Sequence, residues 1–96
     1  MPNMNDESLQ RGPRVAERVV FRELDGEAVI LNLDTGTYFG LDDVGTCIWQ
    51  RLDRQEPIAA VVAALVEEYD VAPETARADV DRLIAQLVDK GLLCQT

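Results

Sequence analysis

Residues 31–52, LNLDTGTYFGLDDVGTCIWQRL, constrain the fold more than any other part of this 96-residue chain. The segment holds the end of an apolar strand, a turn at residues 34–36, a short strand at 37–41 and the start of a helix. Hairpin loops of three residues usually end in the left-handed region, which Gly36 enters without steric cost. The segment therefore predicts an antiparallel pair of strands that is followed directly by a helix.

Two strands are predicted before the turn at residues 34–36. Val15, Val19 and Phe21 share one face of a two-residue period. Asp25-Gly26 then gives a two-residue hairpin turn. The next strand, residues 27–33, is apolar on both faces, which suits the middle of a sheet. The result is a three-stranded antiparallel sheet with residues 37–41 at one margin.

The first helix begins after Asp42 or Asp43, since either carboxylate can accept hydrogen bonds from free amides of the first turn. Its apolar stripe continues to Leu52. Gly45 lowers the helix propensity by about 1 kcal/mol relative to alanine. We therefore expect a packing reason for this glycine, such as a close approach of the helix to the sheet.

Two further helices open at Pro57 and Pro73, where the missing amide does no harm. The last one ends before Gly91, which fits a left-handed cap with Leu92 packed back on the helix. The pattern predicts an α+β fold in which a three-stranded antiparallel sheet is followed by three helices that cover one of its faces. Residues 1–14 are polar and without periodicity, so we expect a flexible tail there and one domain over residues 15–96.

Catalytic and metal-binding patterns are missing from the sequence. The chain has no histidine, which removes the commonest general base and the usual zinc ligand. Cys47 and Cys94 lie far apart and in no metal spacing. No glycine-rich phosphate loop is present. We therefore expect no enzymatic activity, no metal and no cofactor.

The charge distribution argues against nucleic acid. The net charge is −9, and residues 1–24 carry four acids and four arginines, so residues 25–96 carry the entire −9. Helices beside a hairpin are typical of winged helix-turn-helix proteins, yet the third helix is itself acidic by one charge. Phosphate contacts supply most of the affinity of such DNA readers. Neither nucleic acid nor an anionic membrane is an expected partner.

The marginal strand is the remaining candidate site. Residues 37–41 are aromatic and uncharged and contain no proline, so they lack the features that normally protect a sheet edge. Such an edge can accept an extended peptide as one more strand. The last helix is the natural opposite wall of a groove. The alternatives are that helix or tail residues cover the edge, or that a second copy of the chain pairs with it.

The sequence also resembles a known family. LNLDTGTYFGLDDVGTCIW, then AALVEEYDV, then ADVDRLIAQLVDKGLL are similar to the PqqD-like family of leader-binding proteins, or RiPP recognition elements. The resemblance covers residues 18–93. It implies a winged-helix-like domain without enzymatic activity that binds the leader of a ribosomally made precursor peptide. It also implies delivery of this peptide to a modifying enzyme such as a radical SAM enzyme, a cyclase or a leader protease.

The resemblance places the leader as an antiparallel strand on residues 37–41, in a groove closed by the third helix. The peptide-binding residues that it implies are Thr37, Tyr38, Phe39, Gly40, Leu41, Asp79, Arg82, Leu83 and Gln86. Leu83 stands where the family often has phenylalanine, which would alter one wall of the pocket. The sequence leaves open which of Tyr38 and Phe39 faces the groove.

The sequence also allows predictions of the cellular location and the oligomeric state, and it leaves a rival function open. No apolar run approaches the roughly 18–20 residues of a membrane helix, and the N-terminal segment has no apolar core, so we expect a cytoplasmic protein. A monomer or a weak homodimer is expected. The rival function is a winged-helix adaptor or transcriptional regulator that acts through protein or DNA contacts.

Overall fold

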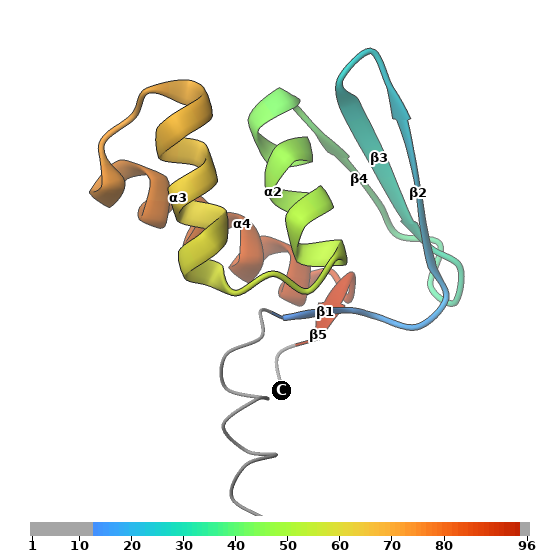
Figure 1. The fold of residues 1–96 in the computed structure, drawn as a ribbon. Coiled ribbons are helices and arrows are strands. Elements are labelled where there is room, and N and C mark those ends of the chain that lie inside the picture. The colour runs from blue at the N-terminus through green and yellow to red at the C-terminus, as the bar shows by residue number, and fades with distance from the viewer. Residues whose placement is uncertain (1–12, 95–96) are drawn as a thin grey trace, which may run out of the picture.

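The computed structural model describes residues 13–94. The elements are β1 (Arg14–Val15), β2 (Val19–Leu24), β3 (Glu27–Asn32), β4 (Tyr38–Leu41), α2 (Asp43–Asp53), α3 (Ile58–Tyr69), α4 (Pro73–Asp89) and β5 (Leu93–Cys94). This order confirms the predicted three-stranded sheet followed by three helices (Figure 1). The tail predicted over residues 1–14 lies outside the described residues, apart from a buried Pro13 and Arg14 of β1.

The main sheet has the strand order β2-β3-β4 and is antiparallel throughout. Ala28, Ile30 and Asn32 of the central strand are buried, whereas Val29 on the alternate face is half exposed. The helices therefore cover the face of Ala28 and Ile30. The sequence showed that β3 is apolar on both faces, but not which of the two faces is covered.

The turns follow the predicted backbone chemistry, with one shift of boundary. Asp25 and Gly26 have φ angles of 54° and 81°, and Gly36 has a φ of 77°, all in the left-handed region. However, β3 ends at Asn32 and not at Leu33. The side-chain oxygen of Asn32 accepts hydrogen bonds from the amides of Asp34 (2.8 Å) and Thr35 (3.2 Å), and so the turn starts one residue early.

The first strand is also interrupted, where the sequence pattern suggested continuity from Val15. Arg18 has a φ of 62°, which separates β1 from β2. β1 leaves the main sheet and pairs with β5, so that Val15 lies opposite Leu93. The extended chain predicted after Leu92 therefore exists as β5, but its partner could not be read from the sequence.

The helices lie to one side of the sheet but do not form one layer over it (Figure 1). α2 packs on β3 and β4, α3 packs on α2, and α4 packs on α3 and β5. The prediction that all three helices cover one face of the sheet is therefore wrong, because α3 and α4 pack mainly on other helices and on β5. Three strands spaced by about 4.8 Å are only about as wide as one helix with its side chains.

The core fills the space between these layers. Its buried apolar residues are Ala28, Ile30, Leu41, Ile48, Trp49, Leu52, Val61, Leu65, Ala76, Val80, Leu83, Ile84, Leu87, Leu92 and Leu93. Trp49 is fully buried, and the ring of Phe21 meets it edge to face with centroids 5.8 Å apart. Such pairs stabilise by about 0.5–1.5 kcal/mol beyond the burial of area. This contact fixes α2 against β2 as well as against β3.

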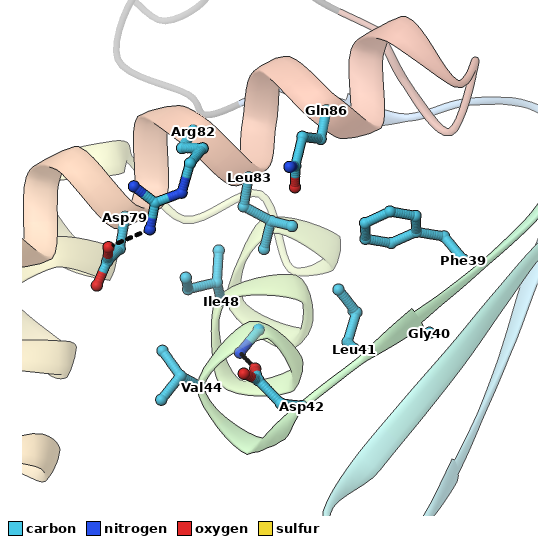
Figure 2. A pocket seen from close by; sticks show the side chains of 11 residues that line it. Phe39, Gly40, Leu41, Asp42, Val44, Ile48, Asp79, Arg82, Leu83 and Gln86 are labelled. Carbon is cyan, nitrogen blue, oxygen red and sulfur yellow. Dashed lines mark hydrogen bonds and ion pairs between the residues drawn. The ribbon is translucent and has the colours of Figure 1, made fainter.

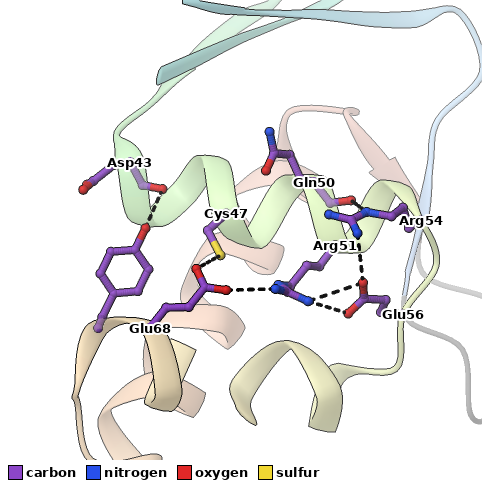
Figure 3. Close-up of polar contacts among 8 residues, drawn as sticks. Asp43, Cys47, Gln50, Arg51, Arg54, Glu56 and Glu68 are labelled. Atoms are coloured by element: carbon purple, nitrogen blue, oxygen red, sulfur yellow. Dashed lines mark hydrogen bonds and ion pairs between the residues drawn. The ribbon is translucent and has the colours of Figure 1, made fainter. Parts of the chain in front are cut away.

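A polar cluster joins α2 to α3 (Figure 3). Arg51 donates to Glu68 on α3 at 2.9 Å and to Glu56 in the connecting loop at 3.2 Å. The thiol of Cys47 lies 3.7 Å from the other carboxylate oxygen of Glu68. Burial raises the pKa of Cys47, and the charge of Glu68 adds to the rise while Arg51 opposes it. The thiol is therefore kept in its protonated form.

The end of α4 is capped as predicted. Gly91 has a φ of 76°, its amide donates to the carbonyl of Val88, and the amide of Leu92 donates to the carbonyl of Leu87. This is the Schellman arrangement of a helix C-terminus.

Within residues 13–94, no helix has the length and apolarity required to cross a bilayer.

Candidate functional site

One edge of β4 is unpaired within residues 13–94. Within the described part of the chain, β4 pairs with β3 alone. The amide of Asn32 donates to the carbonyl of Thr37 at 2.9 Å. Hydrogen bonds of an antiparallel strand alternate between its two sides, so the peptide groups of Thr37 and Phe39 face β3. Those of Tyr38 and Gly40 therefore lie on the open edge.

A groove runs beside this edge, between β4, the first half of α2 and the middle of α4 (Figure 2). Its volume is about 490 Å³, within the range of pockets that bind ligands. It is lined by Phe39, Gly40, Leu41, Asp42, Val44, Gly45, Ile48, Asp79, Arg82, Leu83 and Gln86. The groove thus combines main-chain groups of a strand edge with side chains of two helices.

The floor of the groove is apolar. Leu41, Ile48 and Leu83 are buried and come from β4, α2 and α4 respectively. Phe39 and Val44 are half-buried, and both side chains extend toward the groove (Figure 2). A guest side chain that enters between them would leave water for an apolar surface, which contributes roughly 25 cal/mol for each Å² buried.

The rim on α4 is polar. Arg82 forms an ion pair with Asp79, one turn earlier on the same helix, and Gln86 follows one turn later (Figure 2). The Arg82 side chain is 64% exposed, so its ion pair is screened and contributes little to stability. These groups lie beside the apolar floor and can meet polar or charged atoms of a guest.

Phe39 also links β4 to the end of α4. The ammonium group of Lys90 lies 5.6 Å from the centroid of the Phe39 ring. A cation over an aromatic ring at this distance is attracted by the ring quadrupole. The contact holds the Phe39 ring at the groove and provides a positive charge at that end of it.

Gly45 allows α2 to approach β4 closely. A Cβ at this position would lie 3.1 Å from Cδ2 of Leu41 and 3.2 Å from Oδ1 of Asp42. Asp42 is the N-cap of α2, and this same Oδ1 accepts the amide of Gly45 at 2.8 Å. The expectation of a packing role for Gly45 is confirmed. This close approach places Val44 and Ile48 in the groove.

The structure brings most of the predicted residues together. Phe39, Gly40, Leu41, Asp79, Arg82, Leu83 and Gln86 all line the groove. Tyr38 does not, because alternation along β4 places its side chain on the opposite face of the sheet, where it is 71% exposed. Thr37 precedes β4 and is not part of the lining either. Phe39, and not Tyr38, is the aromatic residue that faces the groove.

α2 also contributes residues to the groove, and these were not among the predicted peptide-binding residues. Asp42, Val44, Gly45 and Ile48 line the groove but had been assigned to helix capping and to the core. The helical spacing of Val44 and Ile48 is evident in the sequence, but this spacing alone does not distinguish a buried stripe from the wall of a groove.

Among the described residues, no cluster of three or more His, Cys, Asp or Glu side chains could hold a metal ion.

Comparisons with known proteins identify a family and two similar structures. The family model described as coenzyme PQQ synthesis protein D (PqqD) matches residues 27–93. TbiB1, solved in complex with the TbiA(beta) leader peptide, is 39% identical with a TM-score of 0.80 and covers 83% of this chain and 93% of its own. A lasso peptide synthetase B1, complexed with the leader peptide, is 27% identical with a TM-score of 0.77 and covers 90% and 99%. No curated protein matches significantly.

Proposed function

The chain belongs to the PqqD family, and we propose that it is a recognition element that binds the leader of a ribosomally made precursor peptide. The leader adds as an antiparallel strand to the open edge of β4, beside α4. The observation that carries the proposal is the position of this edge: it borders an apolar groove whose walls come from α2 and α4. Two similar structures are complexes with leader peptides.

The main chain of β4 supplies part of the affinity. The peptide groups of Tyr38 and Gly40 point away from β3. Each hydrogen bond to a guest strand contributes roughly 1 kcal/mol net, with little demand on the guest sequence. Specificity then comes from side chains, since alternate residues of the added strand point into the groove.

The groove selects the guest by shape and polarity. Its apolar floor of Leu41, Ile48 and Leu83 suits an aliphatic or aromatic anchor residue. Leu83 is smaller than the phenylalanine that the family often has there, and so it leaves more room for this anchor. Arg82 and Gln86 on α4 can donate hydrogen bonds to polar groups of the leader.

The chain does not itself carry out the reaction. It holds the leader so that the attached core peptide meets a modifying enzyme as a tethered reactant, at an effective concentration on the order of 1 mM. A radical SAM enzyme, a cyclase or a leader protease would be such a partner. We place the protein in the cytoplasm, where ribosomes make the precursor, as a monomer or weak homodimer.

The rival function, DNA binding, has little support from the distribution of charge. Its recognition helix would be α4, in which both arginines have an acidic partner one turn away. Arg77 pairs with Asp81 at 3.0 Å, and Arg82 pairs with Asp79. Binding to phosphates requires an excess of cationic groups, whereas residues 25–96 carry a net charge of −9.

Calorimetric titration with a synthetic leader tests the proposal. Candidate leaders are synthesised from short reading frames found beside the gene. Phe39→Asp and Leu83→Asp place a charge in the groove, and each is expected to lower leader affinity at least tenfold. Ala59→Asp, at an exposed position on α3, is the matched control and should bind as the wild type does.

Thermal unfolding separates loss of binding from loss of fold. Phe39 is only half-buried, so Phe39→Asp should keep a cooperative transition close to that of the control. A folded Phe39→Asp variant with unchanged affinity would contradict the groove assignment. A wild-type chain that does not bind the leader would contradict the function itself.

A further inference from the structure

The face of the sheet that the helices leave uncovered is unusually apolar. Tyr38 is 71% exposed, Val29 50% and Val20 48%. We call this surface the outer face and define it by Val20, Leu24, Val29, Leu31, Leu33 and Tyr38. The strand register places Val20, Leu31 and Tyr38 in one row across the three strands. These three side chains thus form a continuous row, and Val29 lies in the next row between Arg22 and Gly40.

Gly40 adds a second observation on the same face. It follows Tyr38 by two residues, so a side chain at this position would point to the outer face. A Cβ there would meet no atom within 4 Å, and the backbone does not have a positive φ. Among the described residues, neither backbone conformation nor packing requires glycine at position 40. Glycine within a strand often marks a site where a ligand or another backbone approaches closely.

The outer face is also neutral on an acidic domain. Residues 25–96 carry a net charge of −9, but the charged residues on this side of β2 and β3 are Arg22 and Glu27, which cancel. Depletion of charge is a feature of the core of protein interfaces. The surface therefore has the composition of a docking site rather than of a solvated sheet face.

The outer face and the groove share β4. A leader strand added to β4 would present alternate side chains to the groove and to the outer face. The side chains on the outer face would lie next to Tyr38 and would extend the apolar surface. Occupancy of the groove thus changes what a partner meets on the other side of the sheet.

The outer face is better suited to a docking site that the added leader strand completes than to self-association. Exposed apolar patches of roughly a few hundred Å² on monomers are often functional. A stable interface needs roughly 800 Å² from each partner. The leader strand added to β4 enlarges the outer face toward this area.

From these observations, and on the basis of the proposed function, we propose that the outer face is the docking surface for the enzyme that acts on the tethered peptide. The enzyme contributes an apolar patch and binds the leader-loaded form more tightly than the free form. Because coupling between two ligands is reciprocal, the enzyme also tightens leader binding by the same factor.

The test uses the full chain, the cognate precursor and the purified enzyme that modifies or cleaves it. Val29→Asp and Val20→Asp place a charge on the outer face, and Ala59→Asp on α3 is the control. Both outer-face variants should bind the isolated leader within about twofold of the wild type. At subsaturating concentrations of the chain they should lower the rate of precursor conversion at least tenfold.

Three outcomes would overturn the inference. Conversion at the wild-type rate with both outer-face variants would show that the enzyme docks elsewhere. A parallel loss of leader affinity would show that the outer face belongs to the leader site. A wild-type dimer in light scattering that Val29→Asp converts to a monomer would assign the face to a second copy. If the wild-type chain does not bind the leader, the proposed function fails first, and calorimetry without the enzyme detects this.

Discussion

The side-chain amide of Asn32 donates a hydrogen bond of 2.9 Å to the carbonyl oxygen of Gly91, across 59 residues of sequence. Asn32 is buried at the end of β3, and its side-chain oxygen also accepts the amides of Asp34 and Thr35. One residue thus joins the turn before β4 to the end of α4. Because β4 and α4 form two walls of the groove, this contact helps to set the width of the groove.

Asn32→Ala is expected to lower the free energy of unfolding by about 2–3 kcal/mol, because buried polar groups lose their partners. Urea denaturation measures the change. Asp34→Ala removes an exposed carboxylate of the same turn and serves as the control, with an expected loss below about 1 kcal/mol. Equal losses for both variants would show that the contact between Asn32 and Gly91 is not important for stability.

Thr46→Val should destabilise the fold although the two side chains have the same shape. The hydroxyl oxygen of Thr46 accepts the amide of Ala28 at 2.8 Å, and both residues are buried. Valine leaves this amide without its partner, at a cost of about 1–3 kcal/mol. Chemical denaturation should show no comparable loss for Thr75→Val, which lies exposed on α4.

Gly45→Ala and Gly40→Ala should act in opposite directions. Alanine at position 45 gains about 1 kcal/mol of helix propensity, but its Cβ would crowd Leu41 and the capping oxygen of Asp42. Overpacking typically costs about 1–3 kcal/mol, so we expect net destabilisation. At position 40 the Cβ meets open space, and alanine should be neutral or stabilising by about 0.5 kcal/mol. Melting temperatures that fall for both variants would contradict this account.

The main chain and the side chain of Tyr38 can be tested separately. Tyr38→Ala keeps the peptide group on the open edge and should leave leader affinity nearly unchanged. Tyr38→Pro removes an amide that does not face β3, and it should weaken leader binding at least tenfold while the domain stays folded. Phe39→Pro removes an amide that faces β3 and should unfold the domain. Calorimetry and circular dichroism distinguish the three; normal leader binding by Tyr38→Pro would exclude strand addition at this residue.

The two cysteines should differ in reactivity. Burial raises the pKa of the Cys47 thiol, and the thiolate is the reactive form. At a given pH Cys47 therefore has a smaller thiolate fraction than an ordinary cysteine. Cys94 is exposed at the end of β5. Iodoacetamide at pH 8 should label Cys94 at least tenfold faster, as measured by peptide mass spectrometry. Glu68→Gln should speed the labelling of Cys47, because the Glu68 charge contributes to the raised pKa.

The sequence by itself determined the local structure. The left-handed glycines at positions 26, 36 and 91, the Asp42 cap and the two helix-opening prolines depend on backbone sterics and on hydrogen bonds within a few residues. Periodicity gave the order of the elements and the marginal position of β4. The family resemblance added the residues of β4 and α4 that would meet a leader.

Only the tertiary structure decided which faces meet. β3 is apolar on both sides, so its periodicity could not tell the covered face of Ile30 from the exposed face of Val29. For the same reason, the sequence could not tell which of Tyr38 and Phe39 faces the groove. The positions of α2 and α4 decide this. The pairing of β1 with β5 and the contact between Asn32 and Gly91 join residues far apart in the chain. Such contacts depend on the packing of the whole domain, and no local pattern encodes them.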